Sequence, residues 1–229
     1  DPAGPEPAEP PDLAGLRDMV DQFVLHYDTL GLSGRCFDIL QNRGLSVHFL
    51  LDVDGTVYQT LDLQERAWHA TIANNRSIGI EIANLGAYPV GEKNPFAVWY
   101  VADEAGGVRL SPPLENPRIR TPDFIARPAR AEPVTGIVQG KELVQYDFTP
   151  EQYAALIRLT GALHRVFPKI RLDYPRDADG ALLLEKMPQA AWAEFGGVIG
   201  HFHIQDDKVD PGPALQWDRL IAEARRLQQ

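Results

Sequence analysis

One isoleucine-rich segment constrains the fold of this chain more than any other, because its apolar residues alternate strictly. Ile78, Ile80 and Ile82 share one side-chain phase, and Gly79 and Glu81 share the other. Successive side chains of a β-strand point to opposite faces of a sheet, so this spacing predicts a strand with one apolar face. Glu81 then lies on the opposite face. A charged glutamate at this position fits either a solvated surface strand or the floor of a catalytic site. Gly79 leaves space beside Glu81, which favours a catalytic site.

The rest of the chain adds strands and helices that would pack around this strand. Asp54-Gly55 is a tight-turn dipeptide between two strand-like runs, which predicts a hairpin. Thr149, Pro150 and Gln152 form a strong helix start with a capping box. The predicted elements are strands at 23–27, 77–84, 96–101 and 143–148, a hairpin at 46–60, and helices at 13–20, 33–42, 149–167, 188–195 and 214–227. This mixture predicts an α/β fold, with a single domain built on a central mixed β-sheet flanked by helices.

Composition limits the partners that this chain could have. The sequence has 22 basic and 32 acidic residues, a net charge of −10, which argues against nucleic acid because phosphates favour a basic surface. No apolar run approaches the roughly 18 residues that a membrane-spanning helix requires, so no transmembrane segment is predicted. Residues 1–12 are rich in Pro, Glu and Ala and predict a flexible tail. Residues 13–229 are then one domain, with a long insertion at 86–149 that lacks a regular core pattern.

Residues 200–213 concentrate titratable side chains in one short segment. Two histidines, three aspartates and one lysine lie within it, after an apolar run and before the C-terminal helix. An imidazole and a carboxylate separated by a loop can bind one Zn²⁺, and a neighbouring lysine would add positive charge beside the metal. Taken alone, the segment fits a solvated polar loop equally well, so the rest of the chain decides between the two.

Five separated blocks of the sequence, taken in order, carry a family resemblance. They are Val24-Leu25-His26-Tyr27, residues 46–58, Ala67-Trp68-His69-Ala70, residues 75–82, and Gly200-His201 with residues 208–213. This order closely resembles that of the zinc-dependent N-acetylmuramoyl-L-alanine amidases of the type 2 family, which share their fold with the peptidoglycan recognition proteins. The resemblance covers most of the chain outside the N-terminal tail and the insertion at 86–149. It implies a peptidoglycan recognition protein-like fold for the domain.

The resemblance also implies a catalytic zinc held by His26, His201 and Asp210. By motif position these are a histidine that ends an early strand, the late histidine directly after Gly200, and a late aspartate that is a cysteine in other members. Two imidazoles and one carboxylate leave the fourth position of zinc for water, as catalytic zinc requires. His203 is a rival for the second ligand, because residues two apart on an extended strand face the same way. The family pattern favours His201.

The same resemblance implies roles for Glu81 and Lys208. Glu81 matches the family's acid/base glutamate on the isoleucine-rich strand, and Lys208 matches its late lysine. Some phage members instead have a tyrosine where this chain has Val47, so Glu81 would act here without one. His69 and Asn75 also lie in family motifs. The resemblance implies that His69 lines the substrate groove, and Asn75 fits either a substrate contact or a solvated loop asparagine.

The implied reaction is hydrolysis of the amide bond between N-acetylmuramic acid and L-alanine, in peptidoglycan or in muropeptides. Two alternatives are a module that binds peptidoglycan without cutting it, and a zinc peptidase that cuts the stem peptide. All the ligand positions are present, together with Glu81 and Lys208, which favours catalysis over binding alone. The Pro/Glu-rich start resembles a tether after an export signal, which favours the cell envelope over the cytoplasm.

Overall fold

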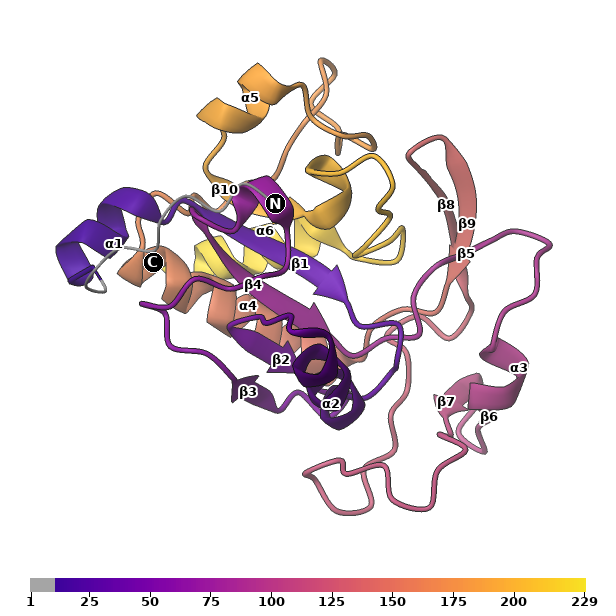
Figure 1. The fold of residues 1–229 in the computed structure, drawn as a ribbon. Coiled ribbons are helices and arrows are strands. Elements are labelled where there is room, and N and C mark those ends of the chain that lie inside the picture. The colour runs from indigo at the N-terminus through magenta and orange to yellow at the C-terminus, as the bar shows by residue number, and fades with distance from the viewer. Residues whose placement is uncertain (1–10) are drawn as a thin grey trace.

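The computed structural model describes residues 11–229 and is built around a five-stranded sheet with the strand order β10–β1–β4–β2–β3 (Figure 1). Its strands are β1 (Gln22–Tyr27), β2 (Phe49–Leu51), β3 (Val57–Gln59), β4 (Ser77–Ile82) and β10 (Gly197–Gly200). Four of these strands run parallel, and β3 runs antiparallel to β2. The isoleucine-rich strand β4 therefore lies inside the sheet, between β1 and β2, so a solvated edge does not explain Glu81.

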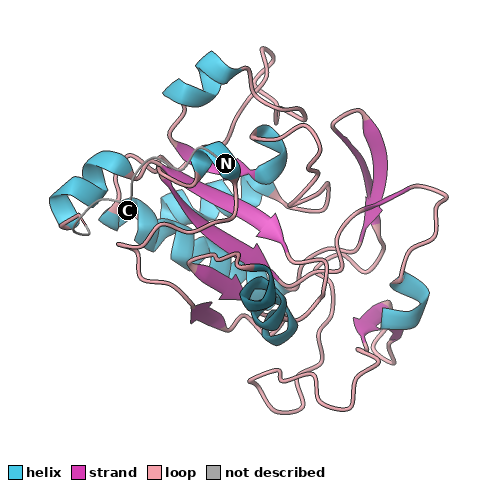
Figure 2. Ribbon diagram, in the orientation of Figure 1, coloured by secondary structure: helices cyan, strands magenta, loops and turns pink. Residues whose placement is uncertain are grey.

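Helices cover both faces of this sheet (Figure 2). They are α1 (Leu13–Met19), α2 (Ser33–Arg43), α4 (Pro150–Val166), α5 (Gln189–Glu194) and α6 (Trp217–Arg226), with the 3-10 turns η1 (Thr71–Ala73) and η2 (His201–His203). The helices α4 and α6 pack against each other and cover one face, while α2 packs on the other face against β2. The predicted fold class, a single α/β domain with a central mixed sheet, is confirmed.

The face beneath α4 and α6 is the main apolar core. Ile78, Ile80 and Ile82 of β4 enter it together with Phe23 and Leu25 of β1, and all five side chains are buried. Burying an apolar side chain of this size contributes roughly 1.5–3 kcal/mol. The strict alternation along β4 therefore fixes which face of the sheet is apolar and leaves the other phase for polar residues.

The long helix α4 begins where the sequence predicts it. The Thr149 hydroxyl accepts a hydrogen bond from the Gln152 backbone N–H at 3.0 Å, and the Gln152 side chain accepts one from the Thr149 N–H at 2.9 Å. These bonds satisfy backbone donors that a helix start leaves without partners. The Gln152 side-chain amide also donates to the Ala83 carbonyl oxygen at 2.8 Å, which ties the helix to the segment after β4.

The predicted insertion at 86–149 lies beyond the carboxyl ends of β1 and β4 in Figure 1. Its elements are β5 (Tyr88–Pro89), α3 (Phe96–Trp99), β6 (Tyr100–Ala102), β7 (Val108–Leu110), β8 (Val134–Val138) and β9 (Lys141–Gln145). The β6–β7 pair is a hairpin, and β5, β9 and β8 form a three-stranded sheet. Trp99 packs in an apolar cluster with Leu32 and Ala83, so this segment shares a small core with the loops of the central sheet.

The strand predicted at 96–101 is wrong over its first four residues. Phe96 to Trp99 form the helical turn α3, and the strand β6 starts only at Tyr100. The turn begins because the Asn94 side chain accepts a hydrogen bond from the Phe96 N–H at 3.1 Å. A side-chain contact of this kind favours a turn over an extended strand.

The N-terminal end of the described chain is helical. Residues 1–10, which make up most of the predicted flexible tail, lie outside the described residues. Asp12 caps α1, since its side chain accepts a hydrogen bond from the Gly15 N–H at 2.8 Å. Over residues 11–229, every helix is too short or too polar to span a bilayer.

Candidate active site

Two neighbouring strands place His26 and Glu81 side by side. In the parallel register of β1 and β4, His26 pairs with Glu81, one residue after Leu25 pairs with Ile80. Strands in a sheet lie about 4.8 Å apart, and successive side chains alternate between faces. His26 and Glu81 therefore both project from the face opposite the isoleucine core.

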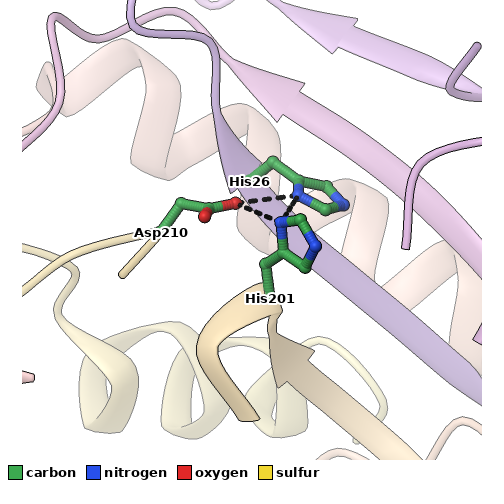
Figure 3. Close-up of side chains that lie close together, drawn as sticks. All are labelled: His26, His201 and Asp210. Atoms are coloured by element: carbon green, nitrogen blue, oxygen red, sulfur yellow. Dashed lines mark hydrogen bonds and ion pairs between the residues drawn. The ribbon is translucent and has the colours of Figure 1, made fainter. Parts of the chain in front are cut away.

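Two further side chains reach His26 from the segment that follows β10. His26 Nδ1 lies 3.0 Å from His201 Nδ1 and 2.8 Å from Asp210 Oδ2, and His201 Nδ1 lies 3.0 Å from the same oxygen (Figure 3). All three residues are buried. We call these three residues the ligand cluster. The structure thus brings together the three residues that the sequence resemblance predicts as metal ligands.

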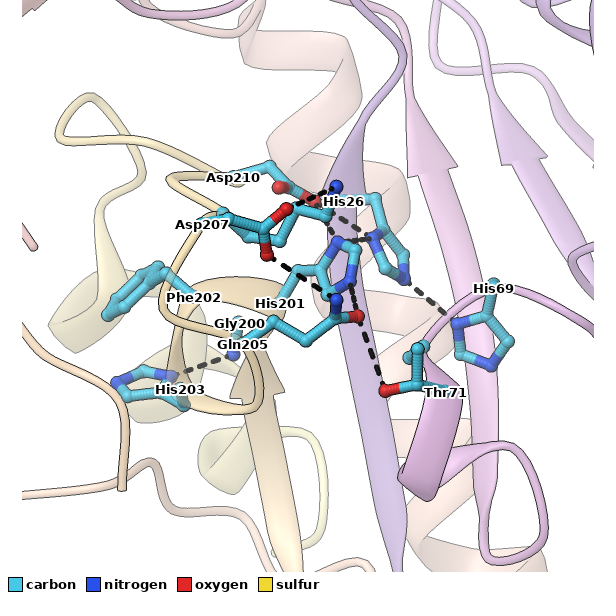
Figure 4. A network of polar contacts seen from close by, with 12 residues as sticks. His26, His69, Thr71, Gly200, His201, Phe202, His203, Gln205, Asp207 and Asp210 are labelled. Atoms are coloured by element: carbon cyan, nitrogen blue, oxygen red, sulfur yellow. Dashed lines mark hydrogen bonds and ion pairs between the residues drawn. The ribbon is translucent and has the colours of Figure 1, made fainter. Parts of the chain in front are cut away.

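The spacing of His201 and His203 leaves open which of the two rings is the second metal ligand, and the structure distinguishes them. The segment is not an extended strand but the 3-10 turn η2, so side chains two residues apart diverge. The buried His203 ring has Nε2 2.8 Å from the Leu183 carbonyl oxygen, and its Nδ1 accepts a hydrogen bond from the Gly200 N–H. Figure 4 shows the two rings pointing in different directions. Of the two histidines, only His201 contributes an atom to the ligand cluster.

Both histidines of the cluster use their second ring nitrogen outside it (Figure 4). His26 Nε2 lies 2.9 Å from His69 Nδ1, and His201 Nε2 lies 2.8 Å from Gln205 Oε1. The Gln139 side-chain amide, at the tip of the β8–β9 hairpin, donates to the Gln205 carbonyl oxygen at 3.0 Å. Sequence reasoning missed both glutamines. The four-residue spacing of His201 and Gln205 is the available signal, but it indicates proximity only where the chain turns helically.

Burial and mutual charge set the protonation states at this site. Burial, together with the neighbouring His201, lowers the pKa of His26 to about 4, so this ring is neutral at pH 7. Burial alone would raise the pKa of Asp210, but the adjacent histidine rings hold it well below its usual range. Burial, reinforced by the charges of Asp210 and Asp28, raises the pKa of Glu81 well above its ordinary value.

Glu81 also has an unsatisfied atom. Its Oε2 oxygen is buried and has no hydrogen-bond partner among residues 11–229. A buried oxygen without a partner costs about 1–3 kcal/mol, so its presence beside the ligand cluster needs a reason. Together with its raised pKa, this marks Glu81 as a group able to accept and return a proton.

Lys208 and His69 lie close to the ligand cluster. The Lys208 ammonium is 3.3 Å from an Asp207 carboxylate oxygen, and its positive charge contributes to the lowered pKa of His26. His69 contacts His26 directly, as described above, and its second ring nitrogen lies 3.2 Å from Ser77 Oγ. Both ring nitrogens of His69 therefore have partners within the protein.

Asn75 is not brought to the ligand cluster. It is exposed and precedes β4, whereas Glu81 lies near the end of that strand. Six residues of extended chain place the two roughly 20 Å apart. Asn75 instead lines a separate cavity of about 770 Å³, together with Trp68 and His48.

The donor set of the ligand cluster fits a metal ion such as zinc. Tetrahedral ligands at Zn–N and Zn–O distances of about 2.0–2.2 Å lie roughly 3.3 Å from one another. The three separations here are 2.8–3.0 Å, so a small outward movement of the side chains would admit an ion. Two imidazoles and one carboxylate would also leave a fourth position for water or substrate.

The sequence match agrees with this geometry. The Amidase_2 profile, described as N-acetylmuramoyl-L-alanine amidase, matches residues 16–213, a span that contains the ligand cluster and Glu81. The chain belongs to this amidase family. The residues of this type 2 amidase-family member that match the profile also include 86–149, the segment predicted as an insertion. No curated protein sequence matches the chain.

Solved structures of other amidases are similar to this chain, and one of them reaches a TM-score of 0.50, which shows a shared fold. One is the complex of the N-acetylmuramyl-L-alanine amidase AmiD from E. coli with the substrate anhydro-N-acetylmuramic acid-L-Ala-D-gamma-Glu-L-Lys. It aligns with a TM-score of 0.50 and 18% identity over 90% of this chain, which spans 57% of the AmiD chain. The N-acetylmuramoyl-L-alanine amidase LysC from Clostridium intestinale URNW aligns with a TM-score of 0.46 and 14% identity, over 92% of this chain and 88% of that one.

Proposed function

We propose that this chain is a zinc-dependent N-acetylmuramoyl-L-alanine amidase, which hydrolyses the amide between N-acetylmuramic acid and L-alanine in peptidoglycan or muropeptides. The observation that carries the proposal is the convergence of three donor atoms from His26, His201 and Asp210 within 3.0 Å of one another, next to Glu81. Membership of the amidase family and the muropeptide bound to AmiD, a protein of similar fold, support the same substrate class.

The ligand cluster would hold the zinc ion. When bound, Zn²⁺ lowers the pKa of a coordinated water to about 7 and polarises the scissile carbonyl group. The neutral His26 ring and the ionised Asp210 are already in the protonation states that zinc ligands need.

Glu81 would move the proton. It lies beside His26 in the sheet, and burial raises its pKa well above the ordinary value, so it takes up a proton more readily than an exposed glutamate. It takes the proton from the attacking water and then delivers it to the amide nitrogen of L-alanine as that nitrogen leaves. Its buried Oε2, which has no hydrogen-bond partner within residues 11–229, would make this hydrogen bond.

Lys208 would stabilise the negative charge that develops on the carbonyl oxygen. It lies on the same segment as His201 and Asp210, close enough for its charge to act on His26. A fixed positive charge next to a developing oxyanion is worth about 10²–10³-fold in rate.

A digestion experiment tests the proposal. Purified protein is incubated with a defined muropeptide, before and after treatment with a chelator, and the products are identified by mass spectrometry. We expect a free stem peptide that begins with L-alanine, loss of this product after chelation, and its return when Zn²⁺ is added. Cuts within the stem peptide would identify a peptidase instead, and binding without any product would identify a recognition module. Either result overturns the proposal.

A further inference from the structure

His69 links the ligand cluster to the protein backbone through a continuous chain of hydrogen bonds. Its Nδ1 lies 2.9 Å from His26 Nε2, a contact visible in Figure 4, and its Nε2 lies 3.2 Å from Ser77 Oγ. The Ser77 hydroxyl donates to the Ala73 carbonyl oxygen at 2.7 Å. The chain therefore runs from a predicted metal ligand through a histidine and a serine to a backbone carbonyl.

The Ala73 carbonyl oxygen, at the end of this hydrogen-bond series, determines which atom donates and which accepts in each of its hydrogen bonds. A carbonyl oxygen only accepts, so the single hydroxyl proton of Ser77 goes to Ala73, and Ser77 Oγ accepts the proton on His69 Nε2. A neutral imidazole has one N–H, so His69 Nδ1 is an acceptor and His26 Nε2 donates to it. His26 Nδ1 is then left with a lone pair that faces the ligand cluster, as a metal ligand requires.

The segment that carries His69 is held on two sides. The Asn74 side chain accepts hydrogen bonds from the backbone N–H groups of His69 and Ala70, at 3.1 and 2.7 Å. On β4, Gly79 leaves the space that the His69 ring fills, because a Cβ atom there would stand 2.6 Å from its Cε1 and Nδ1. The space that the sequence predicts beside Glu81 is thus used to bring a second imidazole up to His26.

We propose that His69 is a positioning residue, which fixes the tautomer and the ring orientation of His26 for metal binding. This inference deepens the proposed function and rests on it. Metal-bound histidines donate their other ring N–H to a carboxylate, a carbonyl or water, and loss of that partner weakens metal affinity or activity about 10–100-fold. In this protein the partner of His26 is the imidazole of His69, whose own tautomer is fixed by Ser77 and Ala73.

The test is the affinity for Zn²⁺ alone, measured by competition with a chromophoric chelator. His69→Phe fills the volume of the ring, excludes water and offers no acceptor, so we expect its zinc dissociation constant to rise about 10–100-fold. His69→Asn places an amide oxygen close to the position of Nδ1 and keeps the acceptor. We expect its zinc affinity to stay within about threefold of the wild-type value.

A second pair of variants tests the Ser77 end of the hydrogen-bond series. Ser77→Ala keeps both imidazoles and removes the acceptor for His69 Nε2, so zinc affinity should fall by a smaller factor than in His69→Phe. Ser33→Ala is the matched control, because the Ser33 hydroxyl is also buried but has no hydrogen-bond partner within residues 11–229. Its zinc affinity should equal that of the wild-type chain. Melting temperatures of the metal-free proteins show whether each variant folds.

The outcomes separate this inference from the proposed function. If His69→Phe folds, binds zinc as tightly as the wild type and raises only KM, His69 contacts substrate and the inference is overturned. If His69→Phe does not fold, unchanged zinc affinity in Ser77→Ala overturns it instead. A wild-type chain that binds no zinc, or cleaves muropeptides equally well after chelation, overturns the proposed function and this inference together.

Discussion

Residues that are adjacent along β1 and β4 enter opposite faces of the central sheet. Leu25 and Ile80 pack in the apolar core beneath α4 and α6, whereas His26 and Glu81, one residue later, lie at the candidate active site. A register shift of one residue would exchange the two faces. The comparison shows that the apolar face fixes the strand register on which the geometry of the site depends.

The two faces also differ in whether their buried polar atoms have hydrogen-bond partners. The core face is built from aliphatic and aromatic side chains, while the site face contains Glu81 with a buried oxygen that has no partner among the described residues. Such an oxygen costs about 1–3 kcal/mol. We therefore expect substitutions on the site face to change catalysis more than stability, and substitutions on the core face to do the reverse.

Glu81→Gln should give the largest catalytic effect, because it removes the proton acceptor and keeps the shape of the side chain. We expect kcat to fall about 10²–10⁴-fold. Zinc content should stay at the wild-type level, since Glu81 is outside the ligand cluster. Steady-state kinetics on a muropeptide, with metal analysis of the same sample, measure both quantities. A variant with wild-type kcat would exclude Glu81 as the acid/base group.

Lys208→Ala should reduce kcat about 10²–10³-fold with zinc retained, because a positive charge beside the developing oxyanion is lost. Lys186→Ala is the matched control. The Lys186 side chain is 45% exposed, against 38% for Lys208, and its ammonium also pairs with an aspartate, Asp206, at 3.6 Å. The control should keep wild-type kcat. Equal losses in the two variants would show that only the general charge of this surface matters.

Ile80→Ala tests the core face of the same strand. Removing this buried side chain should lower the free energy of unfolding by about 2–5 kcal/mol, measured by urea denaturation. Well below the melting temperature, kcat should be unchanged, because the backbone that carries Glu81 stays in place. A large loss of kcat in fully folded Ile80→Ala would contradict the separation of roles between the two faces.

His48 gives the smallest expected effect, through pH. Burial lowers its pKa to about 4, its Nδ1 accepts from the Gly79 N–H, and its Nε2 donates to the Glu65 carbonyl oxygen. The unfolded chain binds this proton near pH 6.5, so the contribution of His48 to stability is complete above that pH and is lost as the pH falls towards 4.

The variant His48→Asn removes this titration. Between pH 7 and pH 5, the wild-type chain should lose about 2 kcal/mol more unfolding free energy than the variant. Urea denaturation at the two pH values gives the difference. Ile80→Ala should show the same pH dependence as the wild type, since it carries no titrating group. Identical pH dependence in His48→Asn and the wild type would show that His48 is not held neutral by the fold.

Local patterns predicted the parts of this structure that local physics determines. Alternation predicted β4 and the phase of Glu81, and the capping box predicted the start of α4. Contacts between distant segments could not be predicted this way. The His69–His26 contact joins residues 43 positions apart, and the Gln139–Gln205 contact joins residues 66 positions apart.

The choice between His201 and His203 shows why part of the site stays hidden in a sequence. An extended strand would turn both rings to one face, and the 3-10 turn separates them, but nothing in the spacing distinguishes the two backbones. The order of the family motifs favoured His201, and the structure places that ring in the ligand cluster. Likewise, the helical turn at Phe96 depends on the side chain of Asn94, which overrides the strand-like run that follows.

The ligand cluster should bind a metal that amide cleavage requires. Zinc content and product release, measured on the same dialysed samples of the wild type and His26→Ala, test it directly. We predict one zinc per wild-type chain and a released peptide that begins with L-alanine, with neither zinc nor product for folded His26→Ala. Release of that peptide by His26→Ala at the wild-type rate would contradict the claim.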